Sequence, residues 1–312
     1  MTRVVTYEPG LRPFGPAVVS VGVYDGVHLG HQALIHDACV LARERGVLSA
    51  VVTFDRDPDR VVDPSHAAPQ LLELTDKLEL LAGLCPDVVL VVPFDEAVAA
   101  MPPDVFLDQL LLPAFTPSAV VVGYDFRFGA RAAGDLSVLG TYGRRHGFEV
   151  VGHPLVRAGG EPVTSTRVRA LVAAGDVAGA AALLGRPHRL RGVVEEGRHV
   201  GGKLGAPTAN VRHAAYAAVP ADGVYACRAT LDEATHAAAV SVGPPLTFAG
   251  APAAVEAHLL DFSGDVYGAG ILLHFLERLR PLERFASPEQ LAAAIARDVE
   301  RVREIARLEG AS

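Results

Sequence analysis

Two histidines, His28 and His31, are the side chains best suited to chemistry, and they lie in the glycine-rich segment Gly-Val-Tyr-Asp-Gly-Val-His-Leu-Gly-His at positions 22–31. An apolar run before the segment predicts a β-strand, and a helical pattern starts near His31. Glycines at such a turn let the backbone approach a phosphate, and a helix N-terminus presents N–H groups. Both imidazoles could then stabilise charge that develops on phosphorus. The other residues of this turn expected at the nucleotide are Gly22, Asp25, Gly26 and Gly30.

Two further segments could bind an anion. Ser165, Thr166 and Arg169 open a helical run, where hydroxyls and guanidinium groups can hold phosphate oxygens. By itself this pattern could equally be an N-cap and a solvated helix face. The third segment follows the fourth strand-like run and offers Asp125 and Arg127 as polar candidates.

The second half of the chain carries a separate set of candidates. Thr208 and Asn210 are two positions apart in an extended segment, so their side chains would point to the same side of it. Their hydroxyl and amide oxygens would suit Mg²⁺. Glu256 alternates with apolar neighbours, and a carboxylate on such a strand can act as general base on an alcohol. Taken alone, Asn210 could equally cap a turn and Glu256 could face solvent.

A near match to a P-loop occurs at residues 197–204, but Leu204 stands where a magnesium-binding Ser or Thr belongs. We interpret this stretch as a glycine-rich phosphate flap, with Lys203 and Pro207 at the nucleotide. The first turn is equally unlike a dinucleotide site, because its spacing is not GxGxxG, which argues against a nicotinamide dehydrogenase.

Strand and helix patterns alternate through the first half, which predicts an α/β domain with a doubly wound parallel sheet. The strands are expected at 17–23, 48–54, 88–92, 119–122 and 149–151, and the helices at 31–45, 75–84, 103–112, 136–146, 166–174 and 177–184. Ligands bind at the carboxyl ends of such strands. After Gly185-Arg186-Pro187 the pattern changes to short strands at 190–195, 224–230, 237–242, 255–261 and 271–278, which favours an antiparallel β-barrel or sandwich. A terminal helix follows, with Ser287 as its N-cap and Gln290 expected to complete a capping box. We expect domains at 1–186 and 187–312.

Composition excludes some classes of protein. The net charge of −8 argues against bulk nucleic-acid binding, and no apolar run is long enough to span a bilayer. No basic segment leads into an apolar stretch at the N-terminus, so we expect no secretory signal. Cys39, Cys85 and Cys227 are too far apart in sequence for a disulfide framework, which favours a reducing cytoplasm. Nothing in the sequence decides between a monomer and a transient homo-oligomer.

Four blocks of the first half resemble the FMN adenylyltransferase module of prokaryotic FAD synthetases, in the HxGH nucleotidyltransferase superfamily. They are the segment 22–31, Val52-Thr53-Phe54-Asp55, Val121-Val122-Gly123-Tyr124-Asp125-Phe126-Arg127-Phe128-Gly129, and Ser165-Thr166-Arg167-Val168-Arg169. In the second half, Gly205-Ala206-Pro207-Thr208-Ala209-Asn210, Pro220–Tyr225, Val255–Phe262 and Asp265–Gly268 resemble the riboflavin kinase module of the same bifunctional enzymes.

The resemblance implies two Mg-ATP-dependent steps, riboflavin to FMN and FMN to FAD. His28 and His31 would contact the ATP phosphates, and Ser165, Thr166 and Arg169 would hold the triphosphate. Thr208 and Asn210 would hold Mg²⁺ and ATP, and Glu256 would deprotonate the ribityl 5′-hydroxyl.

The chain departs from the family pattern around its ligand loops. Asp57 stands where a histidine is usual, so an added negative charge should weaken ATP binding unless Arg56 or Mg²⁺ compensates. Tyr124 replaces a glutamate, Val200–Gly202 replaces a basic flap, and Pro245-Leu246 replaces Asn-Pro. These changes leave open a specialised paralogue with altered flavin or nucleotide preference, or with one activity. A flavin-binding protein without turnover is disfavoured, because it would not need Glu256 or the histidine pair.

Overall fold

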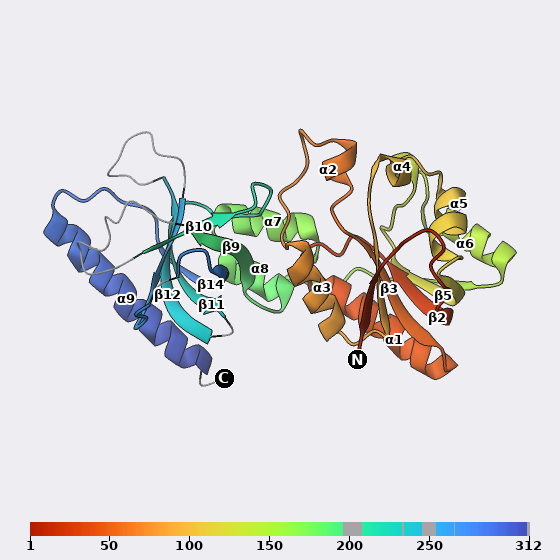
Figure 1. Cartoon of the computed structure of the whole chain (residues 1–312), viewed down its shortest axis with the longest axis horizontal. Coiled ribbons are helices and arrows are strands. Elements are labelled where there is room, and N and C mark those ends of the chain that lie inside the picture. The colour runs from red at the N-terminus through yellow and green to blue at the C-terminus, as the bar shows by residue number, and fades with distance from the viewer. Residues whose placement is uncertain (196–207, 233, 245–253, 265, 311–312) are drawn as a thin grey trace. The chain divides into compact units, whose positions relative to one another are not determined.

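The computed structural model describes residues 1–195, 208–232, 234–244, 254–264 and 266–310 (Figure 1). These residues divide by their contacts into two compact units, Met1–Ser165 and Thr166–Ser312. The helices α7 (Ser165–Ala174) and α8 (Val177–Leu184) thus fall almost wholly in the second unit, although we expected them in the first domain. The boundary between the functional modules stays a prediction.

The first unit is built on a six-stranded sheet in the order β1-β4-β3-β2-β5-β6, and all five strand pairs are parallel. The strands are β1 (Arg3–Thr6), β2 (Gly15–Val21), β3 (Leu48–Phe54), β4 (Val88–Val92), β5 (Phe115–Gly123) and β6 (Glu149–His153). The chain moves outward from β2 in one direction through β3 and β4, and returns to start β5 on the other side. The carboxyl ends of β2 and β5 therefore form the switch point at which such sheets bind ligands.

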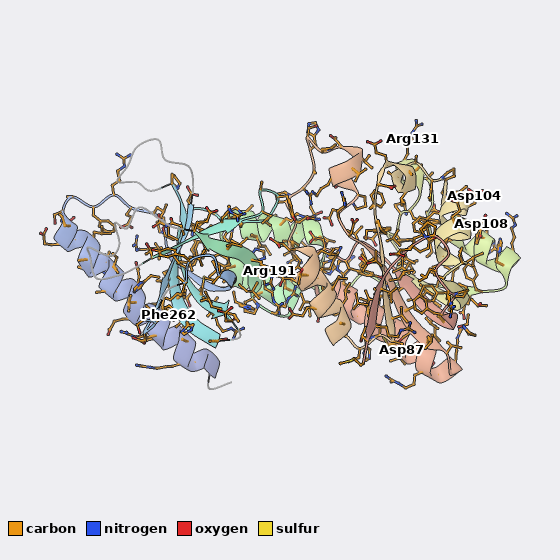
Figure 2. The ribbon with its side chains drawn as sticks, viewed as in Figure 1. Asp87, Asp104, Asp108, Arg131, Arg191 and Phe262 are labelled. Atoms are coloured by element: carbon orange, nitrogen blue, oxygen red, sulfur yellow. The ribbon has the colours of Figure 1, made fainter. Side chains whose placement is uncertain are left out.

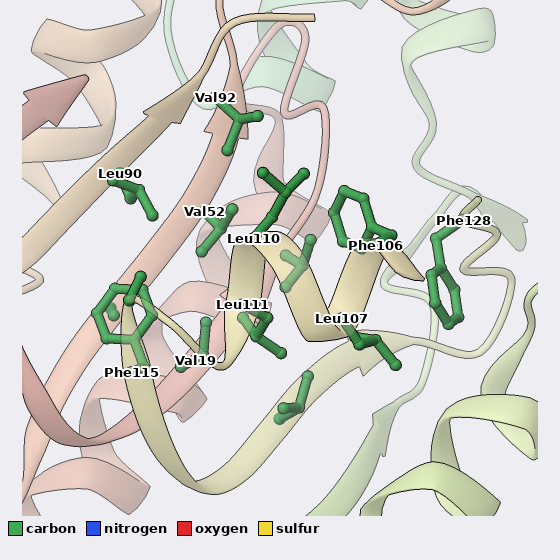
Figure 3. Close-up of a cluster of buried hydrophobic side chains, with 14 of the residues drawn as sticks. Val19, Val52, Leu90, Val92, Phe106, Leu107, Leu110, Leu111, Phe115 and Phe128 are labelled. Carbon is green, nitrogen blue, oxygen red and sulfur yellow. The ribbon is translucent and has the colours of Figure 1, made fainter. Parts of the chain in front are cut away.

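Helices cover both faces of this sheet, as the alternating pattern predicted. One face packs against α1 (Leu29–Arg45) and α3 (Leu74–Gly83), through buried side chains such as Ile35 and Leu81. The other face packs against α5 (Pro103–Phe106), the π-turn Leu107–Leu111 and α6 (Leu136–His146). Figure 3 shows Leu110 next to Val52 on that second face, and Phe106 between Leu110 and Phe128. Burial on both faces explains why β4 consists wholly of valine and leucine.

Polar contacts join the amino ends of the strands β3 and β4. Asp87, which directly precedes β4 (Figure 2), accepts hydrogen bonds from the N–H and the hydroxyl of Ser49 on β3, at 2.8 and 2.9 Å. The turns with the candidate residues of the sequence analysis lie at the carboxyl ends of the strands, after β2 and after β5. The short elements α2 (Asp59–Val62), α4 (Glu96–Ala99), the 3₁₀ turn Ala130–Ala132 and the hairpin β7 (Arg157–Ala158) and β8 (Glu161–Pro162) complete the unit.

The second unit is a closed antiparallel barrel in the order β10-β13-β12-β11-β14-β9. Its strands are β9 (His188–Glu195), β10 (Ala209–His213), β11 (Gly223–Leu231), β12 (Ala234–Gly243), β13 (Ala254–Leu259) and β14 (Gly270–Arg280). Alternate residues fill its interior, among them Val211, Val240 and Ala257. The expected barrel is thus confirmed, and intervening residues such as Asn210, Ser241 and Glu256 face away from that core.

The terminal helix α9 (Pro288–Gly310) packs Val302 and Ile305 on the outside of the barrel against Ala226 and Leu260. Ser287 accepts a hydrogen bond from the Gln290 N–H at 3.4 Å, as expected of an N-cap. The expected capping box is only half formed, because the Gln290 side chain accepts from the Ala286 N–H instead of that of Ser287.

Several elements of the structure differ from the sequence expectations. The edge strand β1 was not foreseen because it is short and mostly exposed. Strand β10 was foreseen only as an extended segment, because a five-residue strand in a glycine- and proline-rich stretch shows no period of its own. The helix expected at 103–112 is one turn of α-helix that widens into a π-turn, and α1 begins two residues earlier than expected.

Candidate functional site

The histidine turn after β2 forms a compact imidazole pair. His28 is the N-cap of α1, and its Nδ1 accepts a hydrogen bond from the His31 N–H at 3.3 Å. The two rings stack with their centroids 3.6 Å apart and their planes 19° from parallel. Because Nδ1 of His28 is an acceptor, the proton of the neutral ring resides on Nε2, from which it can be donated to a phosphate oxygen.

The backbone of this turn is held in an unusual conformation. Tyr24 and Val27 have φ angles of 55° and 40°, and Gly26 has φ of 82°. Left-handed φ is costly for side chains other than glycine, and such strain concentrates at functional sites. Gly30 has a separate requirement, because a Cβ there would lie 3.1 Å from the His28 ring and 3.4 Å from the Val163 carbonyl oxygen. The turn therefore fixes the position of the His28 ring.

Asp25 supports the turn from within. Its side chain is 3% exposed and accepts hydrogen bonds from the backbone N–H groups of Leu71 and Leu72, at 3.0 and 3.2 Å. We expected Asp25 at the nucleotide, and the structure gives its carboxylate a backbone role that no sequence pattern signalled. Its main chain reaches a second predicted site, because the Ser165 hydroxyl donates to the Asp25 carbonyl oxygen at 2.8 Å. Ser165 and the histidine turn are therefore side by side.

Thr166 and Arg169 continue α7 beyond Ser165. Thr166 is exposed, and Arg169 is half-buried one helical turn after Ser165. Residues four apart share one helix face, so Arg169 and Ser165 belong to the same face of α7. Their predicted contact with the triphosphate stays a prediction.

The turn after β5 provides the other side of the switch point. Asp125 and Arg127 are both exposed, and Arg127 Nη1 donates to the Phe126 carbonyl oxygen at 2.9 Å. Phe126 and Phe128 stack with their centroids 5.4 Å apart, and Phe128 is buried in the core. Tyr124 is 59% exposed.

Lys77 is a buried cation at this edge of the sheet that the sequence analysis did not identify. It is 3% exposed, and its Nζ donates to the carbonyl oxygens of Val23 and Phe54, at 3.2 and 2.7 Å. It therefore joins the carboxyl ends of β2 and β3. Burial lowers the pKa of Lys77, and among nearby charges Asp57 opposes that shift most strongly. In a helical sequence a lysine is usually expected at the solvated surface, so nothing in the sequence indicated that Lys77 is buried.

The unusual acid Asp57 is buried near a cation that we did not expect. Asp57 is 7% exposed, and the charge of Lys77 acts on it. Arg56, which we considered as the compensating group, is bound to Asp55 at 2.7 Å. The buried lysine is therefore a positive charge near the position where the family usually has a histidine.

We expect Lys77→Met to destabilise the chain by about 3–5 kcal/mol, because it leaves carboxylates buried without their cation. In the Asp57→Asn background, Lys77→Met should lower the free energy of unfolding by less. The coupling energy between the two substitutions should be about 1 kcal/mol or more. Thermal unfolding of the four proteins of this cycle measures the coupling. Additive losses would show that Lys77 and Asp57 act independently.

A second site lies on the outer face of the barrel, where four polar residues of four adjacent strands stand in register. Asn210 on β10 is directly opposite Glu256 on β13 and Glu195 on β9, and Glu256 is opposite Ser241 on β12. Directly opposed side chains in antiparallel strands have Cβ atoms about 4.5–5.5 Å apart. The register thus brings together Asn210 and Glu256, which are 46 positions apart in sequence. Glu195 also pairs with Arg212.

The chemistry of this row fits its predicted roles. Thr208 directly precedes β10 and is half-buried, so it supplies a hydroxyl oxygen two residues from the Asn210 amide. Hydroxyl, amide and carboxylate oxygens are ligands that suit Mg²⁺. Burial raises the pKa of Glu256, which brings it closer to that of an effective base at neutral pH. Lys203, Pro207, Val200–Gly202 and Pro245-Leu246 lie outside the described residues.

The raised pKa of Glu256 predicts a pH dependence. A general base must be ionised, and burial disfavours the ionised form. Phosphorylation should therefore decline as pH falls, with its midpoint above the ordinary value for a glutamate. The pH dependence of kcat/KM for riboflavin from pH 4 to 9 reports the free enzyme and tests this, and a midpoint at or below the ordinary value would contradict it.

Comparison with known proteins now defines the class. A family model of FAD synthetase matches residues 13–167, and one of riboflavin kinase matches residues 184–306. The chain is therefore a transferase with two enzymatic modules, as expected. No helix among the described residues is long and apolar enough to cross a membrane.

Similarity extends over nearly the whole chain. It is 37% identical to the bifunctional riboflavin kinase/FMN adenylyltransferase of Pseudomonas fluorescens, with 93% of each chain covered. The enzyme of the same description from Escherichia coli K12 is 36% identical, with 92% of each covered. The chain belongs to the bifunctional riboflavin kinase/FMN adenylyltransferase family. A crystal structure described as a macrolide-efflux protein from Streptococcus pneumoniae shares the fold, with a TM-score of 0.86, 28% identity, and coverage of 96% of this chain and 98% of that one.

Proposed function

We propose that the barrel module phosphorylates riboflavin to FMN and that the sheet module adenylylates FMN to FAD, both with Mg-ATP. The main observation behind this proposal is the register of the barrel, which places Glu256 directly opposite Asn210. Burial also raises the pKa of the Glu256 carboxyl. The family matches on both halves support the pairing of the two activities. We assign residues 1–186 and 187–312 to the two modules.

In the barrel, Glu256 accepts the proton of the ribityl 5′-hydroxyl as that oxygen attacks the γ-phosphorus of ATP, and ADP leaves. Thr208 and Asn210 would hold Mg²⁺, which when bound neutralises charge on the phosphates. Lys203 and Pro207 are proposed nucleotide contacts of the adjoining flap.

In the sheet module, an oxygen of the FMN phosphate attacks the α-phosphorus of ATP in line, and pyrophosphate leaves. His28 Nε2 and the His31 ring donate hydrogen bonds to the phosphates as negative charge shifts to the leaving group. Ser165, Thr166 and Arg169 hold the triphosphate, while Gly22, Gly26 and Gly30 let the backbone approach it. Asp125 and Arg127 are proposed contacts from the β5 side, and Asp25 shapes the turn. Positioning and charge neutralisation perform the catalysis without a covalent enzyme intermediate.

We further propose a cytoplasmic protein that acts as a monomer or a transient homo-oligomer. The use of ATP and the three free cysteines, Cys39, Cys85 and Cys227, support the location. The partners are small-molecule flavins and ATP, and the net charge of −8 disfavours nucleic acid.

Isotope position in the products tests the two reaction types separately. With riboflavin and ATP labelled at the γ-phosphate, we expect label in FMN; with FMN and ATP labelled at the α-phosphate, we expect label in FAD. Pyrophosphate should be released only in the second reaction. FMN labelled from the α-phosphate, or FAD formed without α-label, would contradict the mechanism.

A further inference from the structure

A buried tyrosine lies directly against one of the two histidines. The Tyr24 ring meets the His31 ring edge to face, with centroids 5.2 Å apart and planes at 88°. Tyr24 is 3% exposed and precedes His31 by seven residues, on the strained part of the turn. An edge-to-face contact of aromatic rings is directional, so the position of one ring constrains the other.

The tyrosine is itself anchored across the switch point. Its hydroxyl lies 2.7 Å from the Ser20 hydroxyl on β2, and the Ser20 hydroxyl donates to the Val121 carbonyl oxygen on β5 at 3.0 Å. Ser20 has one proton, which the Val121 bond uses, so Tyr24 donates to Ser20. Burial holds the pKa of Tyr24 above its usual value, so the phenol stays a donor. These contacts therefore connect Val121 on β5, through Ser20 on β2 and then Tyr24, to the His31 ring.

Close packing leaves the ring little freedom. A Cβ at Gly22 would lie 2.8 Å from the Tyr24 ring, so the ring rests directly on the Gly22 backbone. Tyr24 also has φ of 55°, which persists only where surrounding contacts determine it. The Ser20 hydrogen bond and the Gly22 contact are such contacts. His31, in contrast, is only half-buried at the first turn of α1.

We propose that Tyr24 is a positioning residue for His31, and that Ser20 fixes Tyr24 by accepting its hydroxyl proton in a hydrogen bond. The proposal rests on the proposed adenylyltransferase function of the histidine turn. The ring of Tyr24 limits the rotation of the His31 imidazole, so that it meets the phosphates in one orientation. A misplacement of about 1 Å at a catalytic group can cost about 100-fold in rate.

The test compares Tyr24→Leu with Tyr24→Phe in FMN adenylylation. Tyr24→Leu should lower kcat by about 10- to 100-fold with KM for ATP nearly unchanged, because binding contacts remain while the transition-state contact is displaced. Tyr24→Phe keeps the ring and should recover most of that loss. Ser20→Ala should have no added effect on kcat in the Tyr24→Phe background, because the Tyr24–Ser20 hydrogen bond is already lost there and the Ser20–Val121 bond does not involve Tyr24.

A matched control is Tyr142→Leu on α6. Tyr142 is 6% exposed in the same unit, hydrogen-bonds Asp108, and packs on the opposite face of the sheet. It should lower the unfolding temperature without lowering kcat. Riboflavin phosphorylation should be unchanged in every variant. A Tyr24→Leu kcat within twofold of wild type, or a Tyr142→Leu kcat loss of the same size, would overturn the proposal.

A readout without turnover separates this proposal from the function on which it rests. Nuclear Overhauser contacts between the His28 and His31 rings, assigned with His31→Gln, report the orientation of His31. They should weaken in Tyr24→Leu and stay close to wild type in Tyr24→Phe, and unchanged contacts in Tyr24→Leu overturn the proposal. If the wild-type chain formed no FAD, the proposed function would fail, and these contacts would still decide whether Tyr24 positions His31.

Discussion

Glu256→Gln should lower riboflavin phosphorylation by about 100- to 10,000-fold, the range expected when a general base is removed. Glutamine keeps the shape and the cross-strand position beside Asn210, but it cannot accept the 5′-hydroxyl proton. Adenylylation of supplied FMN should remain at the wild-type rate. The loss should appear in kcat, because the carboxylate acts only as the proton moves.

The control for this experiment is Glu277→Gln, the same change elsewhere on the barrel, where the side chain pairs with Arg301. Both variants should fold. Burial raises the pKa of Glu256 in the folded state, so its ionisation weakens the fold as pH rises through that pKa, and Glu256→Gln should be no less stable at pH 8. Near-wild-type phosphorylation by Glu256→Gln would disprove the assignment of the base. Equal losses in both reactions would show a defect in folding instead.

His28→Ala combined with His31→Ala should lower FAD formation by about 1,000-fold or more, since each removes a donor aimed at developing charge. The stacked rings act on one set of phosphates, so the double loss should be smaller than the product of the single losses. Phosphorylation of riboflavin should continue, and FMN should therefore accumulate. The measurement is the rate of FMN and FAD release by each variant.

His146→Ala is the matched control, because His146 stacks on Tyr142 at the exposed side of α6. It should leave FAD formation unchanged. Persistent adenylylation in the double histidine variant would refute the role of the HxGH turn, whereas loss of FMN formation as well would indicate coupled modules.

Local sequence patterns predicted most of the architecture and the histidine turn. His28 and His31 are close in sequence, so their pairing follows from one strand-to-helix turn. Asn210 and Glu256 could be selected by residue type and family resemblance, but only the barrel register shows that they are opposite each other. Strand β10 pairs with β9 and β13 across glycine-rich connections, and no local period predicts such pairing.

The residues that sequence reasoning missed act through burial. Lys77 looks like a surface lysine of α3, and only the tertiary fold places it beneath Val23 and Phe54. The Asp25 carboxylate accepts hydrogen bonds from Leu71 and Leu72, a contact that depends on the returning chain, and its place at the nucleotide stays a prediction. Tyr24 appeared as one letter of a glycine-rich motif, because its contacts with Ser20 and His31 depend on side-chain packing.

Asp57 and Tyr124 differ from the residues usual in the family, and both belong to turns expected near the ligands. Substrate preference is therefore the property that these two residues could change. Asp57 lies near the buried cation Lys77, so we expect the added acid to leave the adenylylation activity in place. Tyr124 is exposed at the carboxyl end of β5, where it could alter the base or flavin that is accepted. A paralogue with shifted preference is the second candidate function that these two positions favour.

The most direct test of the central claim is the set of products formed from riboflavin. Purified protein with Mg²⁺ is supplied separately with ATP, CTP and GTP, and the flavins are resolved by chromatography with mass detection. We expect FMN followed by FAD, with ATP as the nucleotide incorporated. No flavin product from riboflavin and ATP would contradict the account, and a non-adenine dinucleotide would establish the specialised paralogue in its place.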